Sequence, residues 1–383
     1  MSKRLLSLAI CIIMIASLLA GCGGSTPAQS SAPGTSNQPA AQQPSQNNQT
    51  AAGDDELNFV IIVKSYQSTY WLAAVKGAQE QMKKRGVNAT FNGPNSESDI
   101  ADQVQMFNDA INSKPDGIGI AACDPSAMLD ALQAAKEAGI PVIAFDSGIP
   151  NAPAGSVLAT ASTDNYKAGV TAAEGMWKAI ENRVKNASGK VRIGVVNQDA
   201  VSESITNRGL GFIDKMTELC KAAGKKTAVI GNDLYVTKAK DKGDEATADV
   251  IIEVRVPSQT TTELCATEAS AILNQSDTIA VFGSNQVAAE GILTANQNLG
   301  VLGSTDDKII AVGFDAGSII KAAVKDGTMY GAVTQSPLKM GEVTIDLLIA
   351  AAKGEPVSDV DTGGAWYNKD NMDDPSIAPN LYD

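Results

Sequence analysis

Short apolar runs alternate with amphipathic stretches along most of the chain. Runs rich in Val and Ile occupy residues 59–63, 117–122, 141–145, 191–196, 250–256, 279–282 and 309–313, with a weaker run at 87–91. Apolar runs of this length are typical of strands that are buried on both faces, as in parallel sheets. Between two of them, Ile100, Val104, Phe107 and Ile111 share one face of a predicted helix. The alternation predicts an α/β fold built on doubly wound parallel sheets.

Two segments carry local signals of their own. Asp124 and Pro125 predict the start of a helix over 125–138, which Gly139 ends. Residues 231–249 are charged and lack an apolar period, so we predict an inserted loop there. Its acidic residues do not have the spacing of a calcium-binding loop, and a solvated loop is therefore expected rather than a calcium site.

The amino-terminal segment predicts where the protein works. Lys3 and Arg4 precede a short apolar stretch that ends in Leu19-Ala20-Gly21-Cys22. This pattern predicts a secretory signal peptide over 1–21, since the stretch is shorter than the roughly 20 apolar residues that a membrane span needs. The last four residues resemble the lipobox of bacterial lipoproteins, which implies cleavage before Cys22 and acylation of that cysteine. Residues 22–54, small and polar after the cysteine, predict a flexible linker.

The composition of the chain argues against several classes of function. The net charge of −13 disfavours nucleic acid as a partner. The chain has no histidine, which removes the commonest general base and metal ligand, and no two cysteines have a zinc-ligand spacing. We therefore expect no cofactor and no metal. The missing histidine also argues against an enzyme, although it does not exclude one that uses carboxylates or lysine. Cys123, Cys220 and Cys265 are predicted to be free, mostly buried thiols, because the helices of the last two fall on opposite faces of one sheet.

Candidate ligand-binding side chains follow the predicted strands, where open α/β sheets bind their ligands. They are Ser68, Tyr70, Trp71, Asp124, Asp146, Arg208, Asn285 and Asp315. A sugar suits this set, because carboxylates and a guanidinium bridge neighbouring hydroxyls and an aromatic ring packs against the apolar face of the sugar. Each residue also has a structural alternative: the rings can pack in the core, the aspartates and Asn285 can cap helices, and Arg208 can form an ion pair.

Four motifs in order carry a resemblance to a known family. They are Pro141-Val-Ile-Ala-Phe-Asp146, Arg208-Gly-Leu-Gly-Phe212, Val281-Phe-Gly-Ser-Asn285 and Val312-Gly-Phe-Asp315. With them, residues 57–367 resemble the type I periplasmic sugar-binding proteins of ABC importers, close to the ribose-binding type. The resemblance adds Gln335 to the ligand-binding set. Ser68 and Ser147 depart from the ribose-binding pattern, which has asparagine and arginine there, so ribose itself is not the expected sugar.

The resemblance implies a fold of two lobes joined by a three-stranded hinge. Its crossovers would lie near 162–164, 334–336 and 360–362, so that lobe 1 holds 55–162 plus 336–361 and lobe 2 holds 163–335 plus 362–383.

The implied function is that of a monomeric, extracytoplasmic lipoprotein tethered to the cell membrane. It would capture a monosaccharide or related polyol by hinge closure and deliver it to an ABC permease with its ATPase. Two alternatives remain at this stage. One is a receptor for a sugar-like signal in chemotaxis or quorum sensing. The other is a surface sugar-processing enzyme that uses Asp146 and Asp315 as its acid and base.

Overall fold

The computed structural model describes residues 56–383. The predicted signal peptide over 1–21, the lipidated Cys22 and the linker over 22–54 lie outside the described residues. Within residues 56–383, no helix combines the length and the apolar character needed to cross a membrane.

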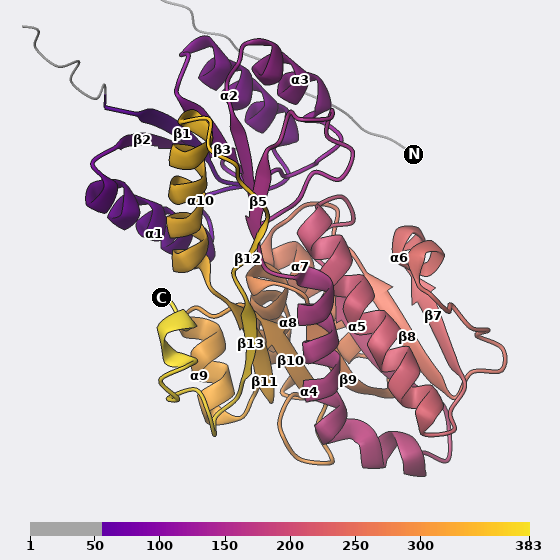
Figure 1. Ribbon diagram of the computed structural model, residues 1–383. Coiled ribbons are helices and arrows are strands. Elements are labelled where there is room, and N and C mark those ends of the chain that lie inside the picture. The colour runs from indigo at the N-terminus through magenta and orange to yellow at the C-terminus, as the bar shows by residue number, and fades with distance from the viewer. Residues whose placement is uncertain (1–55) are drawn as a thin grey trace, which may run out of the picture. The chain divides into compact units, whose positions relative to one another are not determined.

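The first sheet has six parallel strands in the order β12-β5-β4-β3-β1-β2. Its strands are β1 (Asn58–Ile62), β2 (Asn88–Asn92), β3 (Gly117–Ile120), β4 (Val142–Phe145), β5 (Ala159–Ser162) and β12 (Val360–Asp361). Helices α1 (Thr69–Arg85) and α10 (Pro337–Ala352) pack on one face. Helices α2 (Ile100–Asn112) and α3 (Leu129–Glu137) pack on the other (Figure 1). We call this set of elements the first half.

The second sheet has seven strands in the order β13-β11-β10-β9-β6-β8-β7, of which only β13, at one edge, is antiparallel. Its strands are β6 (Val191–Val196), β7 (Thr227–Gly231), β8 (Val250–Arg255), β9 (Thr278–Gly283), β10 (Ile310–Phe314), β11 (Gly331–Gln335) and β13 (Gly364–Tyr367). Helices α4 (Asn165–Asn186) and α5 (Glu203–Ala222) cover one face. Helices α7 (Thr262–Leu273), α8 (Gln286–Leu299) and α9 (Ser318–Asp326) cover the other. These elements form the second half.

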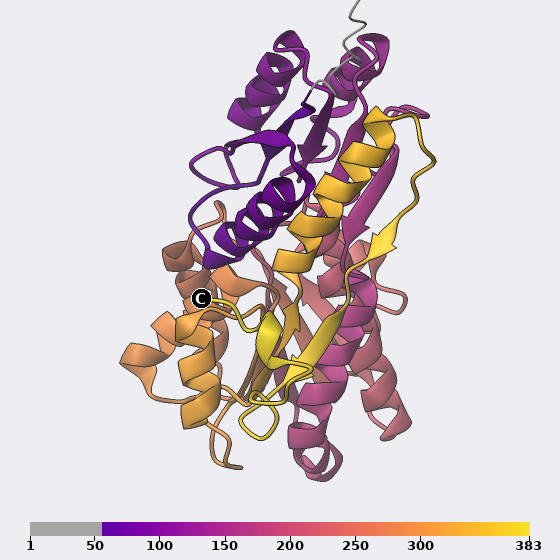
Figure 2. The ribbon, with the colours of Figure 1, turned by 60° about the vertical axis from the view of Figure 1, so that its left-hand side comes forward.

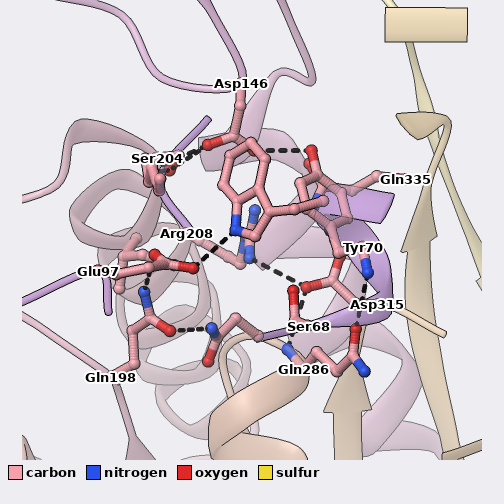
Figure 3. A pocket seen from close by; sticks show the side chains of 14 residues that line it. Ser68, Tyr70, Glu97, Asp146, Gln198, Ser204, Arg208, Gln286, Asp315 and Gln335 are labelled. Carbon is pink, nitrogen blue, oxygen red and sulfur yellow. Dashed lines mark hydrogen bonds and ion pairs between the residues drawn. The ribbon is translucent and has the colours of Figure 1, made fainter. Parts of the chain in front are cut away.

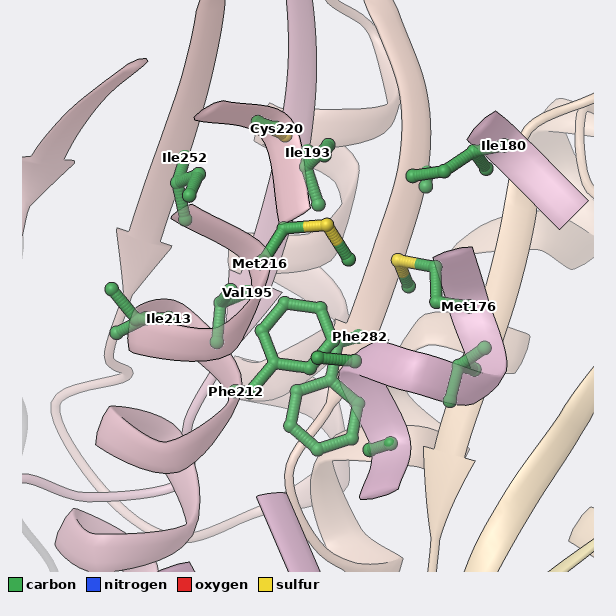
Figure 4. Packing of buried hydrophobic residues seen from close by; sticks show 14 of the residues in the cluster. Met176, Ile180, Ile193, Val195, Phe212, Ile213, Met216, Cys220, Ile252 and Phe282 are labelled. Atoms are coloured by element: carbon green, nitrogen blue, oxygen red, sulfur yellow. The ribbon is translucent and has the colours of Figure 1, made fainter. Parts of the chain in front are cut away.

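The core of the second half shows why its helices adhere to the sheet. The rings of Phe212 on α5 and Phe282 on β9 stack with their centroids 4.4 Å apart, and Met176 and Met216 lie in the same buried cluster (Figure 4). Fully burying such side chains stabilises each by about 1.5–3 kcal/mol. The apolar positions of α4 and α5 thus fix both helices over β6, β9 and β10.

The predicted α/β class with two parallel sheets is confirmed. The chain passes between the sheets three times: between β5 and α4, between β11 and α10, and between β12 and β13 (Figure 2). The predicted free thiols are also confirmed, because Cys123, Cys220 and Cys265 are buried and unbridged. Cys220 packs with α4 and α5, whereas Cys265 packs with the helices of the opposite face. Burial raises the pKa of both thiols to about 12.

Two local predictions are wrong in part. The helix predicted over 125–138 begins only at Leu129, because the Asp124 carboxylate accepts hydrogen bonds from the N–H groups of Ser126 and Ala127 and so caps a preceding turn. The predicted loop over 231–249 contains helix α6 (Asp233–Lys238), which the Asn232 side chain caps and which buries Tyr235. With β7 before it, this segment adds an edge strand and a short helix to the second sheet.

Candidate functional site

Side chains from both halves line one pocket at the carboxyl ends of the strands (Figure 3). It is lined by Lys64, Ser68, Tyr70, Trp71, Glu97, Asp146, Gln198, Ser204, Ile205, Arg208, Asn285, Gln286, Asp315 and Gln335. Of the predicted ligand-binding residues, all but Asp124 are among them. Asp124 instead borders a separate surface depression with Pro125 and Ser126.

Equivalent turns in the two sheets present the two aspartates. Asp146 follows β4 with φ of 62°, and Asp315 follows β10 with φ of 72°. The N–H of each donates to the neighbouring strand, at 2.9 Å to the carbonyl of Ala161 and 2.7 Å to that of Val333. Left-handed backbone is uncommon outside glycine, although Asp tolerates it, and such strain is concentrated at ligand sites. The fold therefore holds both carboxylates in an uncommon conformation that turns them toward the same pocket.

Asp146 is paired with a buried lysine. Its Oδ1 accepts a hydrogen bond of 2.7 Å from the Tyr70 hydroxyl, and its Oδ2 lies 3.0 Å from the Lys64 ammonium. Burial lowers the pKa of Lys64, but Asp146 and the other nearby carboxylates outweigh that effect and raise it, so the ammonium stays charged. Both side chains are almost fully buried.

The same ammonium crosses from the first half to the second. It donates to the hydroxyl of Ser147 at 3.0 Å, and to those of Ser202 and Ser204 at 2.7 and 3.2 Å. Ser202 immediately precedes α5 and Ser204 lies in its first turn. Lys64 thus has hydroxyl partners in both halves in addition to the Asp146 carboxylate.

Asp315 is held by amides. Its Oδ1 accepts 2.6 Å from the Gln335 side-chain amide, and its Oδ2 accepts 3.0 Å from the backbone N–H of Gln286. The guanidinium of Arg208 lies 4.0 Å from the same oxygen. Burial raises the pKa of Asp315, and Arg208 opposes that shift. The Tyr367 hydroxyl fixes the backbone of the turn by donating to the carbonyl of Asp315 at 2.9 Å.

Arg208 and Gln335 keep polar atoms without partners beside the pocket. Arg208 stacks on the Phe314 ring at 3.6 Å and donates at 2.7 Å to both the Ser284 carbonyl and the Asn165 side chain. Within the described residues, its buried Nε has no acceptor and the buried Oε1 of Gln335 has no donor. An unsatisfied buried polar group is costly, and a ligand hydroxyl, which both donates and accepts, would satisfy such atoms.

A second chain of hydrogen bonds joins the halves at the other side of the pocket. The Trp71 indole N–H donates to Glu97 at 2.8 Å, and the Gln198 amide donates to the other oxygen of that carboxylate at 2.7 Å. The Asn285 amide in turn donates to Gln198. Burial raises the pKa of Glu97, and Lys64 opposes the shift. The Tyr70 and Trp71 rings meet edge-on, with centroids 4.9 Å apart.

Sequence reasoning missed five polar residues that line the site, namely Lys64, Glu97, Gln198, Ser204 and Gln286. Lys64 lies two residues beyond β1 and Gln198 two residues beyond β6. Both positions follow a strand directly, which is the sequence signal for a ligand-binding residue in an open α/β sheet. The neighbouring Asn197 is fully buried but does not line the pocket. Glu97 lies in the loop that follows β2, and the weak apolar pattern of that strand gave little reason to search there.

The pocket is small and holds no arrangement suited to a metal. The space that its side chains enclose is about 20 Å³, which is room for roughly one water molecule. Across residues 56–383, no group of three or more Cys, Asp or Glu side chains is placed to hold a metal ion. The site is suited to bind a ligand through hydrogen bonds and aromatic contact.

Comparison with known proteins gives the family. A family model described as the periplasmic binding protein domain matches residues 59–356. The D-allose-binding periplasmic protein of Escherichia coli (strain K12) is 23% identical over 318 residues, covering 79% of this chain and 87% of the relative.

Two solved structures resemble the whole described fold. The "ABC transporter, LacI family transcriptional regulator" from Brachyspira murdochii has a TM-score of 0.71 at 32% identity, covering 86% of this chain and 100% of its own. An ABC transporter solute binding protein from Agrobacterium vitis with bound D-fucose has a TM-score of 0.70 at 30% identity, covering 85% and 100%. Because the family match runs from β1 to just beyond α10, through both halves, this chain belongs to the periplasmic binding protein family and has its type I fold.

Proposed function

We propose that this chain is an extracytoplasmic solute-binding protein that captures one monosaccharide or related polyol and delivers it to an ABC permease. The observation that carries the proposal is the convergence of Asp146 and Asp315, from equivalent strand ends of two sheets, on a pocket that also holds Arg208. The D-allose-binding relative and the neighbour with bound D-fucose support a sugar as the class of ligand.

Each side chain has a role that suits a sugar. Asp146 and Asp315 accept from hydroxyls, and the free Nε of Arg208 donates to one. The free Oε1 of Gln335 accepts a further hydroxyl proton, and Ser68 and Asn285 add polar contacts. Trp71 offers its ring to the apolar C–H face, with Tyr70 beside it.

Binding requires the two halves to move. We propose lobe boundaries at 55–162 plus 336–361 and at 163–335 plus 362–383, with the three passages between the sheets as the hinge. A sugar ring needs far more room than the 20 Å³ now enclosed, so the lobes must separate to admit it. Sugar then favours a closed state only through contacts that the open state lacks.

We propose no enzymatic activity for this site. An acid–base pair needs one carboxyl that gives up a proton and one that takes it. Here Lys64 holds Asp146 as an ion pair, and Asp315 already accepts from two amide donors. If sugar recovered after incubation is chemically altered, the enzyme alternative replaces this proposal.

We also propose that acylated Cys22 anchors the protein to the membrane. The support is the sequence Leu19-Ala20-Gly21-Cys22, followed by a polar linker. Cys22→Ser should release the protein into the soluble fraction of cells. If the variant fractionates with membranes as strongly as wild type does, the anchor lies elsewhere.

Thermal melting against pentoses, hexoses, deoxysugars and polyols tests the sugar proposal. Ligand at about 100 times its dissociation constant adds roughly 2.7 kcal/mol of stability, which raises the melting temperature by at least a couple of degrees. At the same ligand concentration Asp315→Asn should keep about half of the shift or less, whereas Asp124→Ala, outside the pocket, should keep all of it. If no compound in the panel shifts wild type, the ligand is not a neutral sugar.

A further inference from the structure

The carboxyl-terminal tail, residues 368–383, lies beyond the family match, which ends at residue 356. It is nevertheless fastened to the second half close to the site. The Thr334 hydroxyl of β11 donates to the Asn380 carbonyl at 2.8 Å, and the Lys321 ammonium of α9 donates to the Leu381 carbonyl at 3.1 Å. These bonds bring the next residue, Tyr382, to the turn that follows β10.

Tyr382 binds that turn at two points. The backbone N–H of Ala316 donates to the Tyr382 hydroxyl oxygen at 3.1 Å, and the N–H of Gly317 donates to the Tyr382 carbonyl at 3.1 Å. The turn needs such support, because Asp315 has φ of 72°, a conformation that is uncommon outside glycine. Strained backbone persists where surrounding contacts hold it, and Ala316 is fully buried, so no water replaces a lost partner.

The ring of Tyr382 also reaches the first half. It meets the Tyr70 ring edge-on, with centroids 6.0 Å apart and planes at 67°. Both rings belong to one buried cluster with Trp71. The turn itself is packed against α1, since a Cβ added at Gly317 would lie 3.2 Å from the Thr69 hydroxyl oxygen. Tyr382 therefore contacts an aromatic residue of the pocket and the aspartate turn opposite it, without lining the pocket.

We infer that Tyr382 is a positioning residue that holds the Asp315 turn in the conformation that presents its carboxylate to the ligand. The part that concerns ligand affinity rests on the proposed sugar function. The part that concerns the turn does not, and it can be measured without ligand.

Amide hydrogen exchange of the unliganded protein tests the turn. Tyr382→Phe keeps the ring and removes only the hydroxyl, so the Ala316 amide should exchange at least tenfold faster. Tyr166→Phe is the matched control, because its hydroxyl bonds Asp214 on α5 at 2.8 Å, away from the turn. That variant should leave Ala316 unchanged. Equal exchange at Ala316 in Tyr382→Phe and wild type would overturn the inference.

A double-mutant cycle tests the link to the ligand. Wild type, Tyr382→Phe, Asp315→Asn and the double variant are titrated with D-allose and D-fucose. Tyr382→Phe should weaken binding about tenfold in wild type and far less in the Asp315→Asn background, because coupled residues are not additive. Equal losses in both backgrounds would show that Tyr382 does not act through Asp315. If wild type binds neither sugar, the cycle is run with the panel compound that most raises the melting temperature, and if there is none, the proposed sugar function fails while the exchange measurement still decides the role of Tyr382.

Discussion

At the residue scale, the Lys64 and Asp146 charges of the site are paired with each other. Lys64 and Asp146 are nearly fully buried and 3.0 Å apart, and both have further hydrogen bonds. Such a pair adds little net stability relative to apolar residues, but removing one partner leaves an uncompensated buried charge. Substituting Asp146 alone is therefore expected to harm the unliganded protein as well as ligand binding.

A cycle on unliganded stability checks this pair. We expect Asp146→Asn to lower the free energy of unfolding by about 3 kcal/mol or more, because the Lys64 ammonium loses its counter-charge. Lys64→Met together with Asp146→Asn should cost clearly less than the sum of the single changes. Urea unfolding measures all four proteins. Additive losses would show that the two side chains are not coupled.

Glu97 gives the protein a pH dependence. Burial raises the pKa of Glu97 above its usual value of 4.5, so the folded state binds its proton more tightly than the unfolded state does. The stability that this proton contributes is full below pH 4.5 and is lost as the pH rises through the raised pKa.

Glu97→Gln should remove the part of the loss of stability with rising pH that Glu97 causes. Unfolding free energies of wild type and Glu97→Gln, measured from pH 4 to 8, should differ in slope just above pH 4.5. Asp315, whose pKa is also raised, keeps its own contribution in both proteins. Parallel pH profiles would contradict the burial of the Glu97 carboxyl.

The site was predictable where strand ends supply it and not where the fold brings distant residues together. Asp146, Asn285 and Asp315 follow strongly apolar strands, which local sequence reveals. The partners of Lys64 include the hydroxyls of Ser202 and Ser204 in the other half, and no local sequence pattern reveals that contact. Asp124 also follows an apolar strand, but its carboxylate accepts its hydrogen bonds within its own turn and does not reach the pocket.

At the element scale, the missed strands are those that packing defines. β5 reads Ala-Thr-Ala-Ser and β11 reads Gly-Ala-Val-Thr-Gln, both too small and polar to stand out. Every residue of β11 is buried, because the strand lies between β10 and β13 and helices cover both faces of the sheet. β7 has a short apolar run that leads directly into the charged insertion, so the local hydrophobic pattern does not mark it as a strand. The longer strands β6 and β8 were predictable, because a mostly apolar run of six residues is enough to indicate a buried strand.

Glycines let the paired helices of each half approach closely. A Cβ at Gly341 on α10 would lie 2.0 Å from the Ala74 carbonyl oxygen of α1. Between α4 and α5, a Cβ at Gly169 would lie 2.1 Å from the Arg208 carbonyl oxygen. Such distances are far below van der Waals contact, so these helices can pack this closely only with glycine at the crossing points.

Gly341→Ala should therefore destabilise the protein by at least about 2 kcal/mol, through overpacking against backbone that cannot move aside cheaply. Gly189→Ala is the matched control, since an added Cβ there meets nothing within 4 Å. It should change the free energy of unfolding by less than about 1 kcal/mol. Equal effects in urea unfolding would contradict the close crossing of α1 and α10.

At the scale of the whole molecule, direct hydrogen bonds join the two halves. The Gln286 side chain donates to the Thr69 hydroxyl at 3.0 Å, and the N–H of Gly148 donates to Glu203 at 3.0 Å. With the Lys64 and Glu97 contacts, they hold the halves together around a cavity of about 20 Å³. Ligand must therefore replace some of these bonds with its own, and its affinity reflects the difference between the two sets.

Isothermal titration calorimetry with the sugar that most raises the melting temperature tests the central claim most directly. We predict one sugar per chain for wild type. Asp315→Asn should bind about ten- to a hundredfold more weakly, the cost of impairing a charge-assisted hydrogen bond, while Asp124→Ala should bind as wild type does. An absence of binding heat in wild type, or normal binding by Asp315→Asn, would contradict a sugar site between the two halves.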